Sequence, residues 1–161
     1  MNNFSTSLLI KTDLFFYNLS NQHTTVYTMP VDKKTQTITS TITPPFGDKF
    51  QIAAILPIEQ PIIETGKLQK IPISIHLSKS GTDTPLGSYI YSIINHRNDE
   101  VYQTLLNNSE EFLVDMGMKI GRLISKKFKV PSYVSISGNW NIEELLMTIQ
   151  LTIKFIQESY I

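Results

Sequence analysis

Strand-like segments fill the first two-thirds of this chain, and helical periodicity is confined to its last third. Runs rich in β-branched and aromatic residues recur up to residue 106, as in Thr35–Thr43 (TQTITSTIT) and Leu86–Ile94 (LGSYIYSII), and such residues favour strands. Apolar residues at helical spacing form long stripes only after that point. The order predicts a sheet followed by two helices, which can cover only one of its faces.

Composition predicts that residues 1–161 form one globular domain. The chain has 22 isoleucines but only two alanines, Ala53 and Ala54, which excludes an alanine-rich bundle or coiled coil. Hydrophobic residues make up 41% of the chain, too many for a disordered protein. Only 17% of residues are charged, and 14 basic side chains balance 14 acidic ones, so the surface is poorly defended against association.

Turn residues divide the chain into short strand segments. The expected strands are 5–17, 24–28, 35–43, 50–56, 71–77, 86–94, 101–106 and 132–137. The connection 57–70 contains two prolines and a glycine, so we expect a loop there. Ser80–Asp83 also contains a glycine, and we expect it to join its two neighbouring strands as a hairpin.

Two helices are expected, over residues 109–128 and 141–158. Ser109 can cap the first, and Asn141 with Glu144 forms a capping box for the second. The apolar stripe of the first helix is Phe112, Met116, Ile120, Leu123 and Ile124. That of the second is Ile142, Leu145, Leu146, Ile149, Ile153 and Ile156. Gly117 and Gly121 lie on one side of the first helix, which favours a close backbone approach there.

Several apolar residues fall outside the faces that one buried core requires. Tyr89, Tyr91 and Ile93 alternate on the second face of their strand, although a solvated sheet face should be polar. Leu151 and Phe155 lie outside the main stripe of the last helix. The first helix could cover this pair, and folded-over strands of the chain itself could cover the second sheet face. Alternatively, all five residues could bind another chain.

No constellation for catalysis, metals or cofactors is visible. The chain lacks cysteine, and His23, His76 and His96 share no metal-ligand spacing with one another or with carboxylates. Phosphate-binding and nucleophile motifs are also missing. We therefore expect a protein that is not an enzyme and binds no cofactor.

One basic cluster stands out: Arg122, Lys126, Lys127 and Lys129. It could complement the helix dipole, or it could meet an acidic protein surface. Nucleic acid is not expected, because the chain is neutral and has no aromatic residues interleaved with the basic ones. No signal peptide or membrane span is recognisable, so we expect a cytoplasmic protein without a membrane partner, with the nucleus as an additional location.

The order of elements after residue 101 resembles a known family. A strand ends in Thr104-Leu105-Leu106, and a helix containing Gly121-Arg122-Leu123-Ile124-Ser125-Lys126-Lys127 follows. The strand at Pro131–Ser135 and a final amphipathic helix complete the pattern. This arrangement resembles the proteasome assembly chaperone 4 family in its fungal form, or the sister chaperone 3 of the same fold.

The resemblance implies an α+β fold, with an antiparallel sheet of about six strands and two helices packed on one face. It also implies a non-catalytic chaperone for assembly of the proteasome core particle. Such a chaperone pairs with a sister chaperone and holds proteasome α subunits while the α ring forms. The alternatives from other classes are a small-molecule-binding α+β module and a trafficking-type adaptor that acts through protein–protein contacts.

Overall fold

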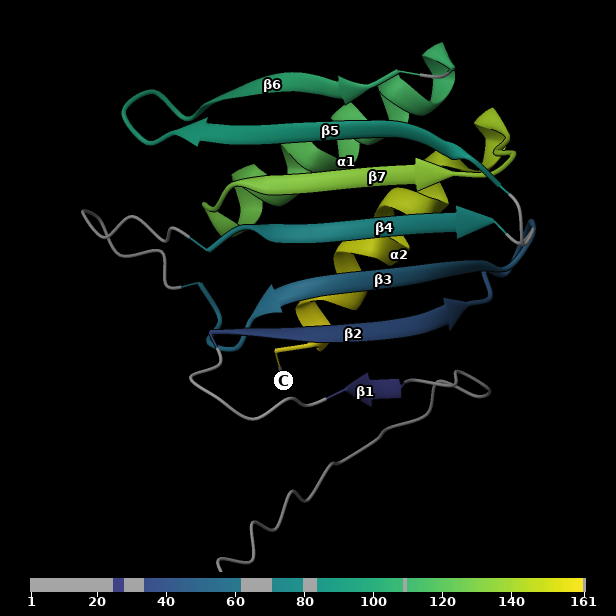
Figure 1. Ribbon diagram of the computed structural model, residues 1–161, viewed down its shortest axis with the longest axis horizontal. Helices are drawn as coiled ribbons and strands as arrows, with labels where there is room; N and C mark the ends of the chain where they lie inside the picture. The colour runs from purple at the N-terminus through teal and green to yellow at the C-terminus, as the bar shows by residue number, and fades with distance from the viewer. Residues whose placement is uncertain (1–24, 28–33, 62–70, 80–83, 109, 161) are drawn as a thin grey trace, which may run out of the picture.

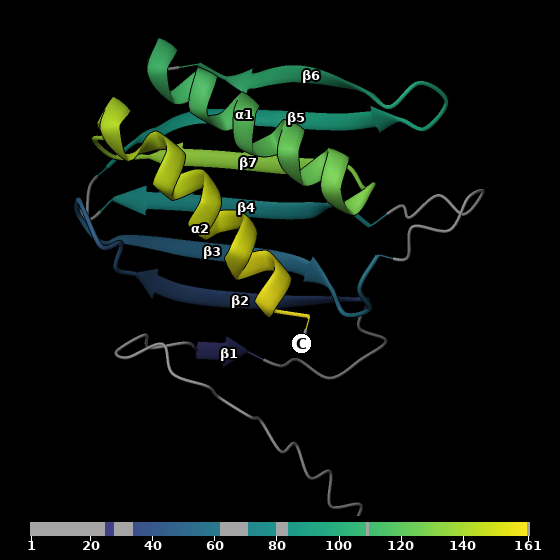
Figure 2. The ribbon, with the colours of Figure 1, turned by 180° about the vertical axis from the view of Figure 1, so that it is seen from behind.

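The computed structural model describes residues 25–27, 34–61, 71–79, 84–108 and 110–160. They form one seven-stranded sheet with two helices on one face (Figures 1 and 2). Its elements are β1 (Thr25–Tyr27), β2 (Thr35–Ile42), β3 (Phe50–Pro57), β4 (Ile73–Lys79), β5 (Leu86–Asn95), β6 (Glu100–Asn107), α1 (Glu111–Phe128), β7 (Ser132–Ser137), a 3-10 turn (Ile142–Glu144) and α2 (Leu145–Glu158). The expected α+β class is confirmed. The strand expected at 5–17, the cap Ser109 and residues 62–70 of the expected loop lie outside the described residues.

The sheet is mixed, whereas an antiparallel one was expected. Its order is β1-β2-β3-β4-β7-β5-β6, and the pair β4–β7 runs parallel. The reason is that α1 carries the chain back along the sheet to the end at which β4 begins. There the Ile73 amide donates a hydrogen bond to the Pro131 carbonyl at 3.0 Å, so both strands start together.

The hairpin expected between the strands at 71–77 and 86–94 is wrong. β7 lies between β4 and β5, with Leu77 opposite Ile136 on one side and Ile90 opposite Val134 on the other. A glycine in a connecting loop signals a turn locally. It carries no information about a strand that arrives much later in the chain and inserts between its neighbours.

The core lies between the sheet and the helices. Alternate residues of the strands and one stripe of each helix fill it, among them Phe50, Ile52, Leu56, Leu77, Ile90, Met116, Ile120, Ile124, Ile136 and Ile156. α1 ends where Lys129 adopts a left-handed conformation (φ 56°) shortly before Pro131. The predicted capping box of Asn141 and Glu144 is present at the start of the last helical segment.

Glycines on α1 and serines on the strands bring helix and sheet close together. A Cβ on Gly117 would lie 2.8 Å from Cγ1 of Ile90, and one on Gly121 would collide with the Ser92 hydroxyl. The Ser132 hydroxyl donates to the Gly121 carbonyl at 3.1 Å. The close approach predicted from the two glycines is therefore present.

The buried stripes of both helices differ in part from those expected. Ile142 and Leu146 are 73% and 66% exposed, and Leu123 of α1 is also exposed. α2 instead buries Thr148 and Thr152 beside Ile149 and Ile156. Leu151 and Phe155 are half-buried and also pack against the core.

Replacing Gly121→Ala should lower the free energy of unfolding by up to about 2 kcal/mol. Overpacking costs about 1–3 kcal/mol, and the better helix propensity of alanine returns about 1 kcal/mol. Adding Ser92→Ala removes the colliding hydroxyl and should recover most of the loss. A double-mutant cycle by denaturant unfolding measures this coupling, with the exposed Arg122→Ala as control. Strictly additive effects would show that the contact is not tight.

Candidate partner-binding surface

Tyr89, Tyr91 and Ile93 alternate with the buried residues of β5, so they lie on the face that neither helix covers. Figure 1 views the sheet from this face. Ser88 and Ser92 alternate with them and face α1, and the Ser88 hydroxyl donates to the Leu113 carbonyl at 2.8 Å. The two tyrosines are half-buried by their neighbours, and Ile93 is 40% exposed. We call this side of the sheet the open face.

Two further tyrosines extend this group. The Tyr133 ring lies 4.8 Å from that of Tyr91 and 6.0 Å from that of Tyr89 between centroids. Tyr102 is 55% exposed and pairs with Ile93 across β5 and β6. We call these five residues the tyrosine patch. Sequence reasoning missed Tyr133 and Tyr102, although the alternation of Tyr133 with the apolar Val134 and Ile136 could have indicated its side.

The rest of the open face consists almost entirely of uncharged side chains. From β2 to β7 it presents mainly hydroxyl groups, namely Thr35, Thr37, Thr39, Thr41, Ser74, Ser78 and Ser135, with Gln51, Ala53, Ile55 and His76. Among the described strand residues of this face, Glu100 at the rim of β6 carries the one formal charge. Depletion of charge is typical of the centre of a protein interface.

His76 lies in the middle of this face and adds no charge to it. Its Nδ1 lies 2.8 Å from the Ser135 hydroxyl, across the parallel strand pair. Burial lowers the pKa of His76 below its ordinary value, so the imidazole is uncharged at neutral pH. A depression of about 390 Å³ on this face is lined in part by His76, Thr39 and Gln51.

The basic cluster lies on the helix layer, away from the tyrosine patch. Arg122, Lys126 and Lys127 are exposed, whereas Lys129 donates to Asp99 at 2.7 Å. The hydrogen bond from Lys129 lowers the pKa of Asp99, and the charges of Lys129 and Lys126 add to this effect. The cluster therefore adjoins the turn that leads from β5 into β6.

Leu151 and Phe155 also lie on the helix layer. Both pack against the core, so contacts within this chain bury much of the surface of these two side chains. Their role in binding a partner stays a prediction. Ile142 and Leu146, expected in the core, expose more apolar surface than either residue.

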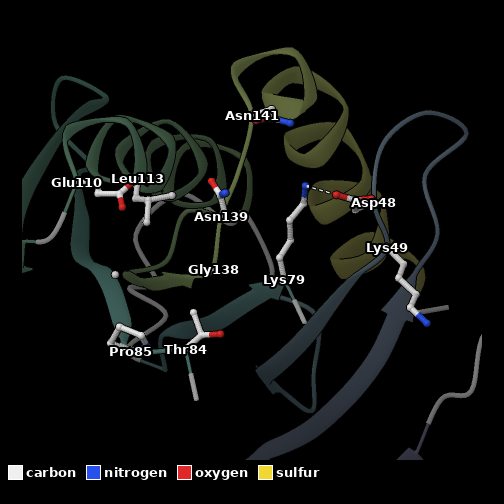
Figure 3. A pocket seen from close by; sticks show the side chains of 11 residues that line it. Asp48, Lys49, Lys79, Thr84, Pro85, Glu110, Leu113, Gly138, Asn139 and Asn141 are labelled. Atoms are coloured by element: carbon white, nitrogen blue, oxygen red, sulfur yellow. Dashed lines mark ion pairs between the residues drawn. The ribbon is translucent and has the colours of Figure 1, made fainter. Parts of the chain in front are cut away.

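A buried ion pair at one corner of the molecule joins the end of β4 to the 3-10 turn before α2. Lys79, at the end of β4, bonds to Glu144 and lies 5.2 Å from the centroid of the Trp140 ring. It also lies 3.5 Å from an oxygen of Asp48 (Figure 3). Burial raises the pKa of Glu144, but hydrogen bonds from Lys79 and from the amides of Asp48 and Asn141 outweigh it, so the pKa is lowered.

A hollow of about 630 Å³ adjoins this corner, lined by Asp48, Lys49, Lys79, Thr84, Pro85, Gly87, Glu110, Leu113, Gly138, Asn139 and Asn141 (Figure 3). Lys79 is the buried charged side chain of this hollow, and it is already paired with Glu144. Ligand pockets are mostly apolar with a few converging polar groups, and this lining is not. Within the described residues, no three potential metal ligands gather and no helix is long and apolar enough to cross a membrane.

Replacing Glu144→Gln should cost about 3 kcal/mol of unfolding free energy at neutral pH, because Lys79 would stay buried with weaker pairing. Since folding lowers the pKa of Glu144, its contribution is present above the unfolded-state pKa and is lost as pH falls through the folded-state pKa. The difference from the native chain should shrink toward acid pH. Unfolding curves across this range, with Glu143→Gln as the exposed control, measure it. A difference independent of pH would contradict the assignment.

Known proteins share this sequence pattern and fold. The family model described as 20S proteasome chaperone assembly proteins 3 and 4 matches residues 24–155. A solved structure titled "Crystal Structure of a Novel Chaperone Complex for Yeast 20S Proteasome Assembly" contains a chain that is 22% identical, with a TM-score of 0.65. That likeness covers 80% of this chain and 99% of the other, and it shows a common fold. No curated protein sequence matches the chain.

Proposed function

The chain belongs to the family of 20S proteasome chaperone assembly proteins 3 and 4, and we propose that it works as one half of a heterodimer. Its partner is a sister chaperone of the same fold. The pair holds proteasome α subunits while the α ring of the core particle assembles. The chain acts through its surfaces and not as an enzyme. It works in the cytoplasm and also in the nucleus, which its lack of cysteine suits.

The open face is the pairing surface in this proposal. The observation that carries it is the near absence of charge on a sheet face that also bears the tyrosine patch. Stacked sheets pack about 10 Å apart through such side chains. Hydroxyl groups and tyrosines can exchange hydrogen bonds across the contact, so buried polar groups can find partners there. Because no described strand residue at the centre of the face is charged, pairing buries no unpaired charge there.

The basic cluster faces the α subunit in this proposal. A chaperone that later leaves its client needs a modest and partly polar interface, at or below the standard buried area of about 1,600 Å². Arg122, Lys126 and Lys127 supply exposed charge on the helix layer, so they are available while the sister chaperone covers the open face.

Replacing Tyr91→Asp should abolish pairing with the sister chaperone. The carboxylate would be desolvated at the centre of the contact without a counter-ion. Co-expression followed by size-exclusion chromatography measures pairing, and circular dichroism checks that the helices remain. Ile142→Asp, an equally drastic change on the helix layer, should pair normally. If the Tyr91 variant pairs normally, the interface with the sister chaperone lies elsewhere.

Reversing the charge of Lys126 and Lys127 to Glu should weaken capture of α subunits by the purified heterodimer, most strongly at low salt. Reversal of Lys154 on α2 serves as the matched control. Binding titrations with each purified α subunit at two ionic strengths give the result. If no α subunit binds the native pair, the chaperone role itself is wrong.

A further inference from the structure

β6 forms one edge of the sheet and presents backbone groups to the outside. Among the described residues, only β5 pairs with it. In an edge strand, alternate N–H and C=O groups point away from the sheet and can hydrogen-bond to another chain. Tyr102, Leu105 and Leu106 flank this edge with exposures of 55%, 37% and 49%.

One charge, at Glu100, and one bulge, between Leu105 and Asn107, protect this edge against strand pairing, and both lie outside residues 101–104. Natural edge strands carry lysines or prolines, or are very short, whereas β6 has eight residues and neither residue type. Its one charge, Glu100, accepts hydrogen bonds from the Asn98 amide at 2.8 Å and the Tyr102 hydroxyl at 3.2 Å. The regular register holds from Glu100 to Leu105 and shifts only between Leu105 and Asn107.

Side-chain contacts hold β6 in place along its length. The Gln103 amide donates to the Met118 carbonyl at 2.8 Å and to the Ser92 hydroxyl at 2.9 Å. The Asn107 amide donates to the Gly87 carbonyl at 2.8 Å, and the pair Lys129–Asp99 fixes the preceding turn. A strand already fixed in extended form loses little conformational entropy when another strand adds to it.

The edge and the open face can be occupied at the same time. A sheet stacked on the open face lies about 10 Å above it, whereas a strand added to β6 lies in the plane of the sheet, about 4.8 Å from β6. The sister chaperone on the open face would therefore leave the edge to a different protein. Lys126 lies in the last turn of α1, just before Lys129, which bonds at 2.7 Å to Asp99 in the turn that precedes β6. The charge of Lys126 would favour an acidic residue in that protein.

We propose that the outer edge of β6, over Glu100–Leu105, binds an extended segment of the client α subunit as an additional strand. The client's identity rests on the proposed function. The segment is largely uncharged, with apolar side chains beside Tyr102 and Leu105 and an acidic residue at the end near Lys126. Backbone hydrogen bonds provide most of the recognition.

Hydrogen exchange tests this proposal on the native heterodimer, with and without each purified α subunit. Strand addition should slow exchange of the outward-pointing β6 amides, in an alternating pattern along Val101–Leu105. An α subunit that binds without changing these amides would overturn the inference and leave the chaperone role standing. If none binds, both fail.

A charged edge should also prevent the addition. Replacing Leu105→Lys together with Leu106→Lys should weaken α-subunit binding at least about tenfold, because lysines disfavour edge pairing. Ile142→Lys with Leu146→Lys is the matched control, and its binding should stay within about twofold. Retained pairing with the sister chaperone shows that the β6 variant is folded. Unchanged α-subunit binding by a folded β6 variant would contradict the proposal.

Discussion

In the part of the chain that the structure describes, two helices lie on one face of a seven-stranded sheet and nothing covers the other face. The close fit of α1 against β5 and β7 fixes this arrangement, because glycines on the helix meet serines on the strands. The alternation of side chains along each strand then determines which residues lie on the open face. Residues that alternate with the core positions of β5 and β7, above all Tyr89, Tyr91 and Tyr133, must point away from the helices.

The surfaces of the molecule divide into three regions with different chemistry. The open face has one charge among its described strand residues, at its rim, and suits a second sheet. The helix layer carries the exposed basic side chains of α1. The edge at β6 offers backbone hydrogen bonds. These regions point in different directions, so a chaperone of this family could hold its sister and its client at once. The corner at Lys79 and Glu144 instead stabilises the fold, since both charges are largely buried and paired.

Local signals in the sequence predicted the local features well. The capping box at Asn141, the close approach at Gly117 and Gly121, and the outward side of Tyr89 and Tyr91 all follow from spacing along a single element. Features that depend on contacts between distant segments were missed. Nothing near residues 71–94 signals that β7 inserts between β4 and β5, and the burial of Thr148 and Thr152 depends on how α2 meets the core. The edge position of β6 likewise follows only from the strand order.

Solvent accessibility of the tyrosines tests the pairing role of the open face most directly. Hydroxyl-radical footprinting of this chain, alone and paired with its sister chaperone, reports the reactivity of Tyr91, Tyr102 and Tyr133. The account predicts that pairing protects these side chains, while Ile142 and Leu146 on the helix layer react as before. Tyrosines that remain equally reactive in the heterodimer would contradict it.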